Sequence, residues 1–172
     1  SKSLIGAFNL DQIINANGSF GYVTNPKLDP VADDNDAGVM HYTSPGSSVA
    51  NVTKMEHYWD EGFGYLYGQD DQYDPLLGQG GLLNDYLAGV DATYAVGIAD
   101  AIYDAFKLGR AAIVVKDYTL RDEQAAIIKV ELSKVVGAKA ASYLRSGAGH
   151  VSNNNMASAF HSLSEGYGLS LI

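Results

Sequence analysis

Large apolar residues recur at intervals of three and four along this chain, the spacing that places side chains on one face of a helix. Glycine, proline and asparagine separate these stretches. The pattern predicts helices over 2–17, from 47–51 to 66, over 82–109 as one helix or two, over 119–144 and over 153–171. Residues 111–115 are apolar enough either to continue a helix or to form a short strand. No other alternation typical of strands stands out, so we predict an all-α helical bundle of five or six helices.

Local signals indicate where some of these helices begin and end. The segment from Thr119 to Asp122 resembles a capping box that opens the fourth helix. Gly147 and Gly149 are expected to end that helix, and the three asparagines at 153–155 to cap the last one. The last helix carries a stripe of large apolar residues that we expect to face the core, namely Met156, Phe160, Leu163, Tyr167 and Leu171.

Two irregular segments, 18–47 and 68–81, are rich in glycine, proline and aspartate. In the first, Asp34-Asn-Asp36-Ala-Gly38 places oxygen ligands at alternate positions before a glycine, as calcium loops do, although the bidentate glutamate of an EF-hand is missing. Solvated acidic loops without an ion are the alternative. The candidate calcium ligands are Asp29, Asp33, Asp34 and Asp36. A weaker second candidate comprises Asp70, Asp71 and Asp74.

The chain has 172 residues, of which 47% are apolar, enough for a single domain over 1–172 with its own core. Its net charge of -9 is uneven, because residues 1–106 hold 15 acids and 3 bases whereas 107–172 hold 5 acids and 8 bases. Such acidity argues against nucleic-acid binding and favours cations. The absence of cysteine excludes disulfides and thiolate metal sites, and no apolar run is long enough to span a membrane. Because the chain begins with Ser1, we expect a longer precursor whose N-terminal part could associate with this domain.

One motif occurs twice. Residues 57–64 read His-Tyr-Trp-Asp-Glu-Gly-Phe-Gly, and residues 161–168 read His-Ser-Leu-Ser-Glu-Gly-Tyr-Gly. Histidine, glutamate, glycine, an aromatic residue and glycine agree in order, and the chain has only 4 histidines, so coincidence is a poor explanation. Each copy follows another predicted helix. The pattern therefore indicates a duplicated helix pair, with the repeat covering about 2–66 and 119–171.

Within each copy the imidazole and the carboxylate are four residues apart and share one helix face. If the two helices face each other, these side chains converge, as they do in carboxylate-bridged metal sites of helical bundles. Such a set suits Zn, Fe or Mn. The alternative is structural, with histidine–carboxylate hydrogen bonds that order a polar layer without a metal. The candidate site residues are His57, Asp60, Glu61, His161 and Glu165, with Asp60 either as a further ligand in the first copy or as a hydrogen-bond acceptor behind the ligands.

The block at 55–65, Met-Glu-His-Tyr-Trp-Asp-Glu-Gly-Phe-Gly-Tyr, resembles the hallmark of a family of uncharacterised bacterial envelope proteins that carry a domain of unknown function. Residues 105–113 and 160–168 resemble two further blocks of that family. The resemblance implies a secreted or lipid-anchored precursor, located in the periplasm or at the cell surface. The family is similar to imelysin-like proteins, duplicated helical bundles associated with iron uptake. Their Gly-x-His-x-x-Glu signature differs from the His-x-x-x-Glu spacing found here.

These observations favour a non-enzymatic, metal-associated binding domain of the bacterial cell envelope, with its His/Glu site between duplicated helices. Its partners would be a metal ion or small ligand, or another envelope protein. The alternative is a structural or adhesion module whose acidic loops are stabilised by calcium. The 12 tyrosines could also cover a carbohydrate or a partner-binding face, and the favoured alternative is that most are core or rim residues whose hydroxyls are hydrogen-bonded. A hydrolase is the least favoured interpretation, because no Gly-x-Ser-x-Gly elbow is present.

Overall fold

The computed structural model describes residues 2–15, 21–24, 27–68, 77–78 and 81–170. The helices in these ranges are α1 (Lys2–Ile14), α2 (Lys54–Tyr67), α3 (Leu82–Thr93), α4 (Ile98–Val114), α5 (Tyr118–Ser152) and α6 (Met156–Leu169). The only β pairing in the described ranges is an isolated bridge between Tyr42 and Val52. The predicted all-α bundle is therefore confirmed. No helix in the described part of the chain is both long and apolar enough to cross a membrane.

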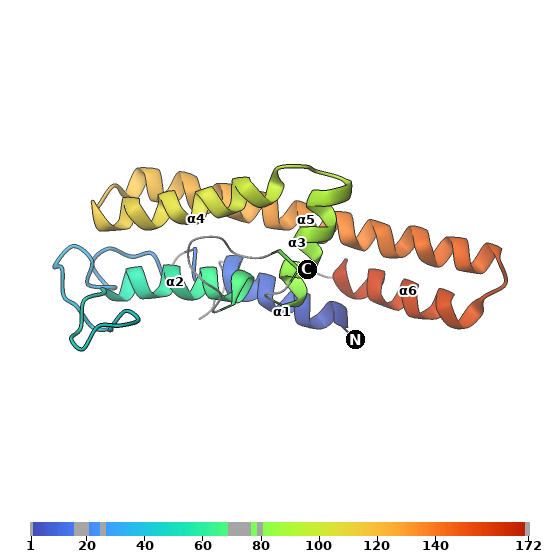
Figure 1. Cartoon of the computed structure of the whole chain (residues 1–172), viewed down its shortest axis with the longest axis horizontal. Coiled ribbons are helices and arrows are strands. Elements are labelled where there is room, and N and C mark those ends of the chain that lie inside the picture. The colour runs from blue at the N-terminus through green and yellow to red at the C-terminus, as the bar shows by residue number, and fades with distance from the viewer. Residues whose placement is uncertain (1, 16–20, 25–26, 69–76, 79–80, 171–172) are drawn as a thin grey trace.

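The helices form an elongated molecule with two layers (Figure 1). Helices α4 and α5 lie side by side in one layer, α2, α1 and α6 follow one another in the other, and α3 crosses near the middle. The 35-residue α5 packs against α4 and continues beyond it to pack against α6. The core includes the buried rings of Trp59 and Phe106, which meet edge to face between α2 and α4. The loop at 27–52 and the α5–α6 hairpin thus occupy opposite ends of the molecule (Figure 1).

Helix α2 begins later than predicted, at Lys54 rather than between 47 and 51. Its N-cap is Thr53, whose hydroxyl accepts the Glu56 amide at 3.2 Å, while the Glu56 carboxylate accepts the Thr53 amide at 2.7 Å. This reciprocal capping box satisfies two backbone donors that the first turn would leave unpaired. The residues before it form turns closed by the Tyr42–Val52 bridge.

The region 82–109 forms two helices, because Gly97 breaks it with a φ of 92°. A residue with a Cβ rarely adopts this left-handed conformation, so the helix that begins at Ile98 is separate from α3. Helix α4 then continues to Val114, which settles the open question at 111–115 in favour of helix.

The start of α5 is set by Asp117, whose carboxylate accepts the Leu120 amide at 3.0 Å. The prediction of a capping box from Thr119 to Asp122 is therefore wrong. Helix α5 also runs through Gly147 and Gly149, so the prediction that these glycines end it is wrong as well.

Close packing between α5 and α6 explains one of these glycines. A Cβ at position 147 would lie 2.6 Å from the Leu163 side chain, so glycine there lets α6 approach rather than stopping the helix. The turn that follows does use the asparagines at 153–155, with Asn155 as the N-cap of α6. Its side-chain oxygen accepts the Ser158 amide at 3.3 Å. The predicted start of the last helix is confirmed.

The prediction that the large apolar stripe of α6 faces the core is wrong. A Cβ at Gly166 would lie 2.9 Å from the Leu144 side chain and 3.2 Å from its backbone nitrogen, so a small residue of α6 faces α5 here, and of the stripe Leu163 packs against α5 at Gly147. The residues of α6 that are buried are Ala159, Ser162, Glu165, Gly166 and Leu169. The residues that are exposed instead include Met156, Phe160, Leu163 and Tyr167, while Leu171 lies outside the described residues.

Candidate functional site

The first copy of the repeated motif lies on α2, where it presents a histidine–glutamate pair at the surface. His57 Nε2 lies 3.3 Å from Glu61 Oε1, one helical turn away, and both side chains are partly exposed. The imidazole also stacks on Tyr42, with 3.8 Å between the ring centroids and 16° between the ring planes. The structure therefore brings His57 and Glu61 together and holds the imidazole in a defined orientation.

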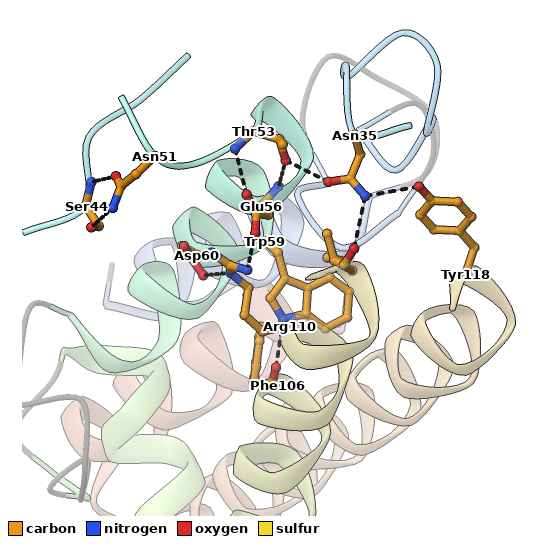
Figure 2. A network of polar contacts seen from close by, with 11 residues as sticks. Asn35, Ser44, Asn51, Thr53, Glu56, Trp59, Asp60, Phe106, Arg110 and Tyr118 are labelled. Atoms are coloured by element: carbon orange, nitrogen blue, oxygen red, sulfur yellow. Dashed lines mark hydrogen bonds and ion pairs between the residues drawn. The ribbon is translucent and has the colours of Figure 1, made fainter. Parts of the chain in front are cut away.

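Asp60, the third candidate in this copy, contacts Arg110 of α4 (Figure 2). Arg110 Nε donates to Asp60 Oδ1 at 2.8 Å, and Arg110 Nη1 donates to Glu56 Oε1 at 2.8 Å. The other oxygen of Glu56 accepts the Thr53 amide, so one carboxylate joins the N-cap of α2 to α4. Asp60 thus takes part in an ion-pair network that holds two helices together.

The start of α2 is also connected to the loop through Asn35, whose side chain is buried (Figure 2). Its amide nitrogen donates to the Ile113 carbonyl and to the Tyr118 hydroxyl, both at 3.0 Å. Its amide oxygen accepts the Thr53 hydroxyl at 2.8 Å. One asparagine therefore links the beginning of α2, the end of α4 and the beginning of α5.

Two further residues of the motif serve packing. Trp59 is fully buried, and its Nε1 donates to the Phe106 carbonyl at 2.8 Å. A Cβ at Gly62 would lie 3.0 Å from the Val23 side chain, so glycine permits the close contact between α2 and residues 21–24. Packing in the core therefore accounts for Trp59 and Gly62. The side chains of the motif that remain partly exposed are the ones that could contact other molecules.

Those side chains join two tyrosines from outside α2 in a cluster that we name the tyrosine face, formed by Tyr22, Tyr42, His57, Tyr58, Glu61 and Tyr65. Tyr22 stacks on Tyr65 with 5.5 Å between centroids and lies 6.0 Å from the Tyr58 ring. Burial and a hydrogen bond with Glu61 raise the pKa of Tyr22 far above its usual value, so its hydroxyl stays protonated. Glu61 therefore connects the Tyr22 hydroxyl to the His57 imidazole.

A cation of the chain itself lies on these rings. Lys27 Nζ is 4.2 Å from the centroid of Tyr58 and 5.6 Å from that of Tyr22, within the distance at which an ammonium is attracted to an aromatic face. Tyr42 and Tyr65 are the more exposed tyrosines of the face. The tyrosine face thus combines oriented rings, one carboxylate and a lysine of the chain that lies against two of the rings.

The second copy of the motif lies on α6, which contacts α1 and α5 but not α2 in the part of the chain that the structure describes. His161 is exposed, whereas Glu165 is buried. Because α2 and α6 lie in different halves of the molecule (Figure 1), the structure does not bring His57 and His161 together. Within the described ranges, no group of three or more His, Asp or Glu side chains is placed to hold a metal ion. The helices that precede the two copies also differ, with 13 residues in α1 and 35 in α5.

In the first acidic loop, Asp34 contacts two basic side chains of the chain itself. Its Oδ2 lies 2.9 Å from Lys54 Nζ and 2.7 Å from His41 Nε2. Hydrogen bonds from Lys54 and His41 hold the pKa of this carboxyl below its usual value. Asp34 therefore joins the loop to the first residue of α2.

The other three predicted calcium ligands also have partners within the chain. Asp29 accepts the amides of residues 31 and 32, and Asp33 accepts the Asp29 amide. Asp36 Oδ1 accepts the Tyr118 hydroxyl at 2.6 Å, and the Asp36 carbonyl accepts Lys116 Nζ at 2.9 Å. These contacts fix the loop by hydrogen bonds that the protein supplies. The weaker calcium candidates lie outside the described residues, namely Asp70, Asp71 and Asp74.

Sequence reasoning did not single out Asn35, Arg110 or the tyrosine face. One signal was available, because Thr53 and Glu56 have the spacing of a capping box. Arg110 gives no comparable signal, since its two partners lie on another helix more than forty positions earlier in the chain. Tyr22 and Tyr42 come from separate loops, and only the fold places them beside α2.

Comparison with known proteins gives one result. No curated protein matches the chain, and no solved structure matches it. A family model described as a domain of unknown function matches residues 1–171. The matched region contains both copies of the motif and every residue of the tyrosine face. The chain therefore belongs to the family of the domain of unknown function DUF4856.

Proposed function

We propose that this protein is a non-enzymatic binding domain whose tyrosine face binds a cationic, arginine-bearing segment of a partner protein. The observation that carries the proposal is the position of Lys27, whose Nζ lies 4.2 Å from the centroid of the Tyr58 ring. The rings of this face are thus arranged to accept a positive charge. An arginine side chain is likewise attracted to ring faces and also pairs with carboxylates.

Preorganisation of the rings supports this proposal. Tyr22 stacks on Tyr65, and Tyr42 stacks on His57, whose imidazole lies against Glu61. Side chains that are already held in one orientation lose little conformational entropy when a partner binds. Tyrosine is also enriched at protein interfaces, because it offers a large apolar ring together with a polar hydroxyl.

Electrostatics support a cationic partner. Glu61 presents a partly exposed carboxylate at the edge of the rings, and residues 1–106 carry 15 acids against 3 bases. This charge attracts basic segments and repels acidic ones over a range of about 10 Å at ordinary ionic strength. The Glu61 carboxylate, which already contacts His57 and Tyr22, can accept a further charge-assisted hydrogen bond from a guanidinium.

The proposal is tested by titrating the full chain with a short peptide that contains several arginines, and with the same peptide after each arginine is replaced by glutamate. We expect binding of the first peptide only. Tyr42→Ala and Tyr65→Ala should each weaken it by about two- to fivefold, the size of an exposed cation–π contact. The matched control is Tyr94→Ala, an exposed tyrosine at the end of α3. Because these substitutions leave the net charge unchanged, equal affinity in all variants would mean attraction by net charge alone and would contradict the proposal.

A second candidate function is a transition-metal site on the same face, favoured by the 3.3 Å distance between His57 Nε2 and Glu61 Oε1. These two donors would need further ligands from a partner or from water. Elemental analysis of protein purified without chelator tests this candidate. Zinc, iron or manganese at one equivalent, lost in His57→Ala but retained in His161→Ala, would support it.

The same analysis tests the calcium-stabilised module. Calcium at one equivalent, lost in Asp34→Asn, would place the ion in the acidic loop at 27–52 and favour an adhesion or structural role.

A location in the bacterial cell envelope is a further proposal, and it rests on the family resemblance described in the sequence analysis. Fractionation of cells that express the natural gene, followed by immunoblotting of the envelope and cytoplasmic fractions, tests it.

A further inference from the structure

The outer face of α6 carries a continuous apolar stripe. The exposed fractions are 55% for Met156, 78% for Phe160, 38% for Leu163 and 64% for Tyr167. These residues follow one another at intervals of four, three and four, the spacing of a helix face that packs against another helix. Soluble monomers rarely expose large apolar residues in such a contiguous group. The stripe is therefore a candidate interface, separate from the tyrosine face on α2.

The reason for this exposure lies in how α6 packs on its own chain. Gly147 of α5 takes the Leu163 side chain, and Gly166 of α6 takes the Leu144 side chain, so the two helices approach closely. The inner face of α6 is consequently filled by small residues such as Ala159 and Ser162. Leu163 thus lies at the edge of the contact between α5 and α6, whereas Met156, Phe160 and Tyr167 stay exposed and available to another molecule.

The charge of the hairpin indicates what kind of molecule covers this stripe. Helix α6 contains no lysine or arginine, and its only acid, Glu165, is buried. From residue 138 to residue 152, α5 contributes only Lys139 and Arg145 as lysine or arginine and no acid. Helices that lie on membrane surfaces carry lysine and arginine along the polar face, and α6 does not. A strongly charged partner would likewise find no charge on the stripe to pair with.

A second copy of the same hairpin offers an apolar, uncharged surface that matches the stripe. Two neutral stripes face each other without repulsion, whereas the acidic remainder of the protein would repel its copy through the net charge of -9. The hairpin lies at the opposite end of the long axis from the loop at 27–52 (Figure 1), so pairing of two hairpins keeps the 27–52 loops of the two copies far apart. Two antiparallel hairpins with facing stripes make a four-helix bundle, and a two-fold axis brings each stripe onto itself. We propose that the protein forms a homodimer through the α6 stripes of two hairpins.

Sedimentation equilibrium of the full chain, up to about 100 μM, tests this proposal. We expect a reversible dimer. Phe160→Asp places a charge in the centre of the stripe and should raise the dissociation constant about tenfold or more. The matched control is Val96→Asp, because Val96 is 88% exposed in the turn between α3 and α4. Circular dichroism confirms that both variants keep their helical content.

Three outcomes would overturn the proposal. The first is a wild-type chain that stays monomeric throughout this range. The second is a Phe160→Asp variant, folded by circular dichroism, that dimerises as well as the wild type, which would place the interface elsewhere. The third is flotation of the wild-type chain with vesicles of phosphatidylcholine and phosphatidylserine that Phe160→Asp abolishes, which would make a lipid surface the occupant. A folded, monomeric Phe160→Asp beside a dimeric Val96→Asp supports the proposal.

Discussion

The indole of Trp59 rests directly on the backbone of α4 at Gly109. A Cβ added at position 109 would lie 2.1 Å from Cζ2 of Trp59, far inside the contact distance of two carbon atoms. The same indole donates a hydrogen bond to the Phe106 carbonyl, less than one turn before the glycine. The motif of α2 and the Gly-Arg pair of α4 therefore form one structural unit, which positions the helix that carries the tyrosine face.

Gly109→Ala is expected to destabilise the protein, because the methyl group forces the indole away from its hydrogen bond and from the core. Overpacking of this kind costs about 1–3 kcal/mol. The measurement is urea unfolding followed by circular dichroism. Gly137→Ala in α5 is the matched control, because a Cβ there meets no atom within 4 Å. That variant should be neutral or gain about 0.5–1 kcal/mol from helix propensity. Equal unfolding free energies for the two variants would contradict the close packing of Trp59 on α4.

Removal of the buried asparagine is expected to loosen the junction between the loop and three helices. Asn35→Ala leaves the Ile113 carbonyl and the Thr53 hydroxyl without this partner, at a cost of about 1–3 kcal/mol in unfolding free energy. Asn51→Ala is the control, since Asn51 also makes two side-chain hydrogen bonds in the same loop but is exposed (Figure 2). Its loss should cost less than about 1 kcal/mol. The expectation fails if the exposed asparagine proves the more costly of the two.

The carboxylate of Asp34 is expected to stabilise the fold only above acid pH. Its pKa is lower in the folded chain than in the unfolded one, chiefly because Lys54 donates a hydrogen bond to it and then because His41 does. A group with a lowered folded pKa contributes stability above its unfolded pKa, about 3.9, and loses that contribution as the pH falls through the folded value.

Urea midpoints of the wild type and Asp34→Asn should therefore differ at about pH 6 and converge at about pH 2. Asp104→Asn removes the same charge from the exposed side of α4, away from the loop, and serves as the control. If the difference between wild type and Asp34→Asn is the same at both pH values, the lowered pKa does not contribute to stability.

Much of the fold could be predicted because helical spacing and end signals are local. The asparagine cap of α6 was readable in the sequence, and so was the helical character of both motif segments. The start of α2 was readable too, since Thr53 and Glu56 have the capping-box spacing, although the predicted start lay several residues earlier, at 47–51. Gly147 shows the limit of these local signals. The sequence alone does not distinguish a glycine that ends a helix from one that a neighbouring helix requires for close packing.

The arrangement of the candidate site could not be predicted from the motif alone. Spacing shows that His57 and Glu61 share a face, but not which helix that face meets. Periodicity identifies the apolar face of α6 without saying what covers it, so the sequence does not distinguish a core-facing stripe from an exposed one. Tyr22 and Tyr42 reach the site from loops, and their contacts with α2 depend on tertiary folding. The part of the site that the sequence showed is the part that lies within one helix.

A nuclear magnetic resonance titration of the isotope-labelled chain with the arginine peptide tests, residue by residue, whether the peptide binds the tyrosine face. We predict that the largest shift changes occur at Tyr22, Tyr42 and residues 57–65, and that Tyr65→Ala reduces them together. Shift changes concentrated instead at residues 29–36, or spread evenly over the acidic surface, would show that the tyrosine face does not bind the peptide.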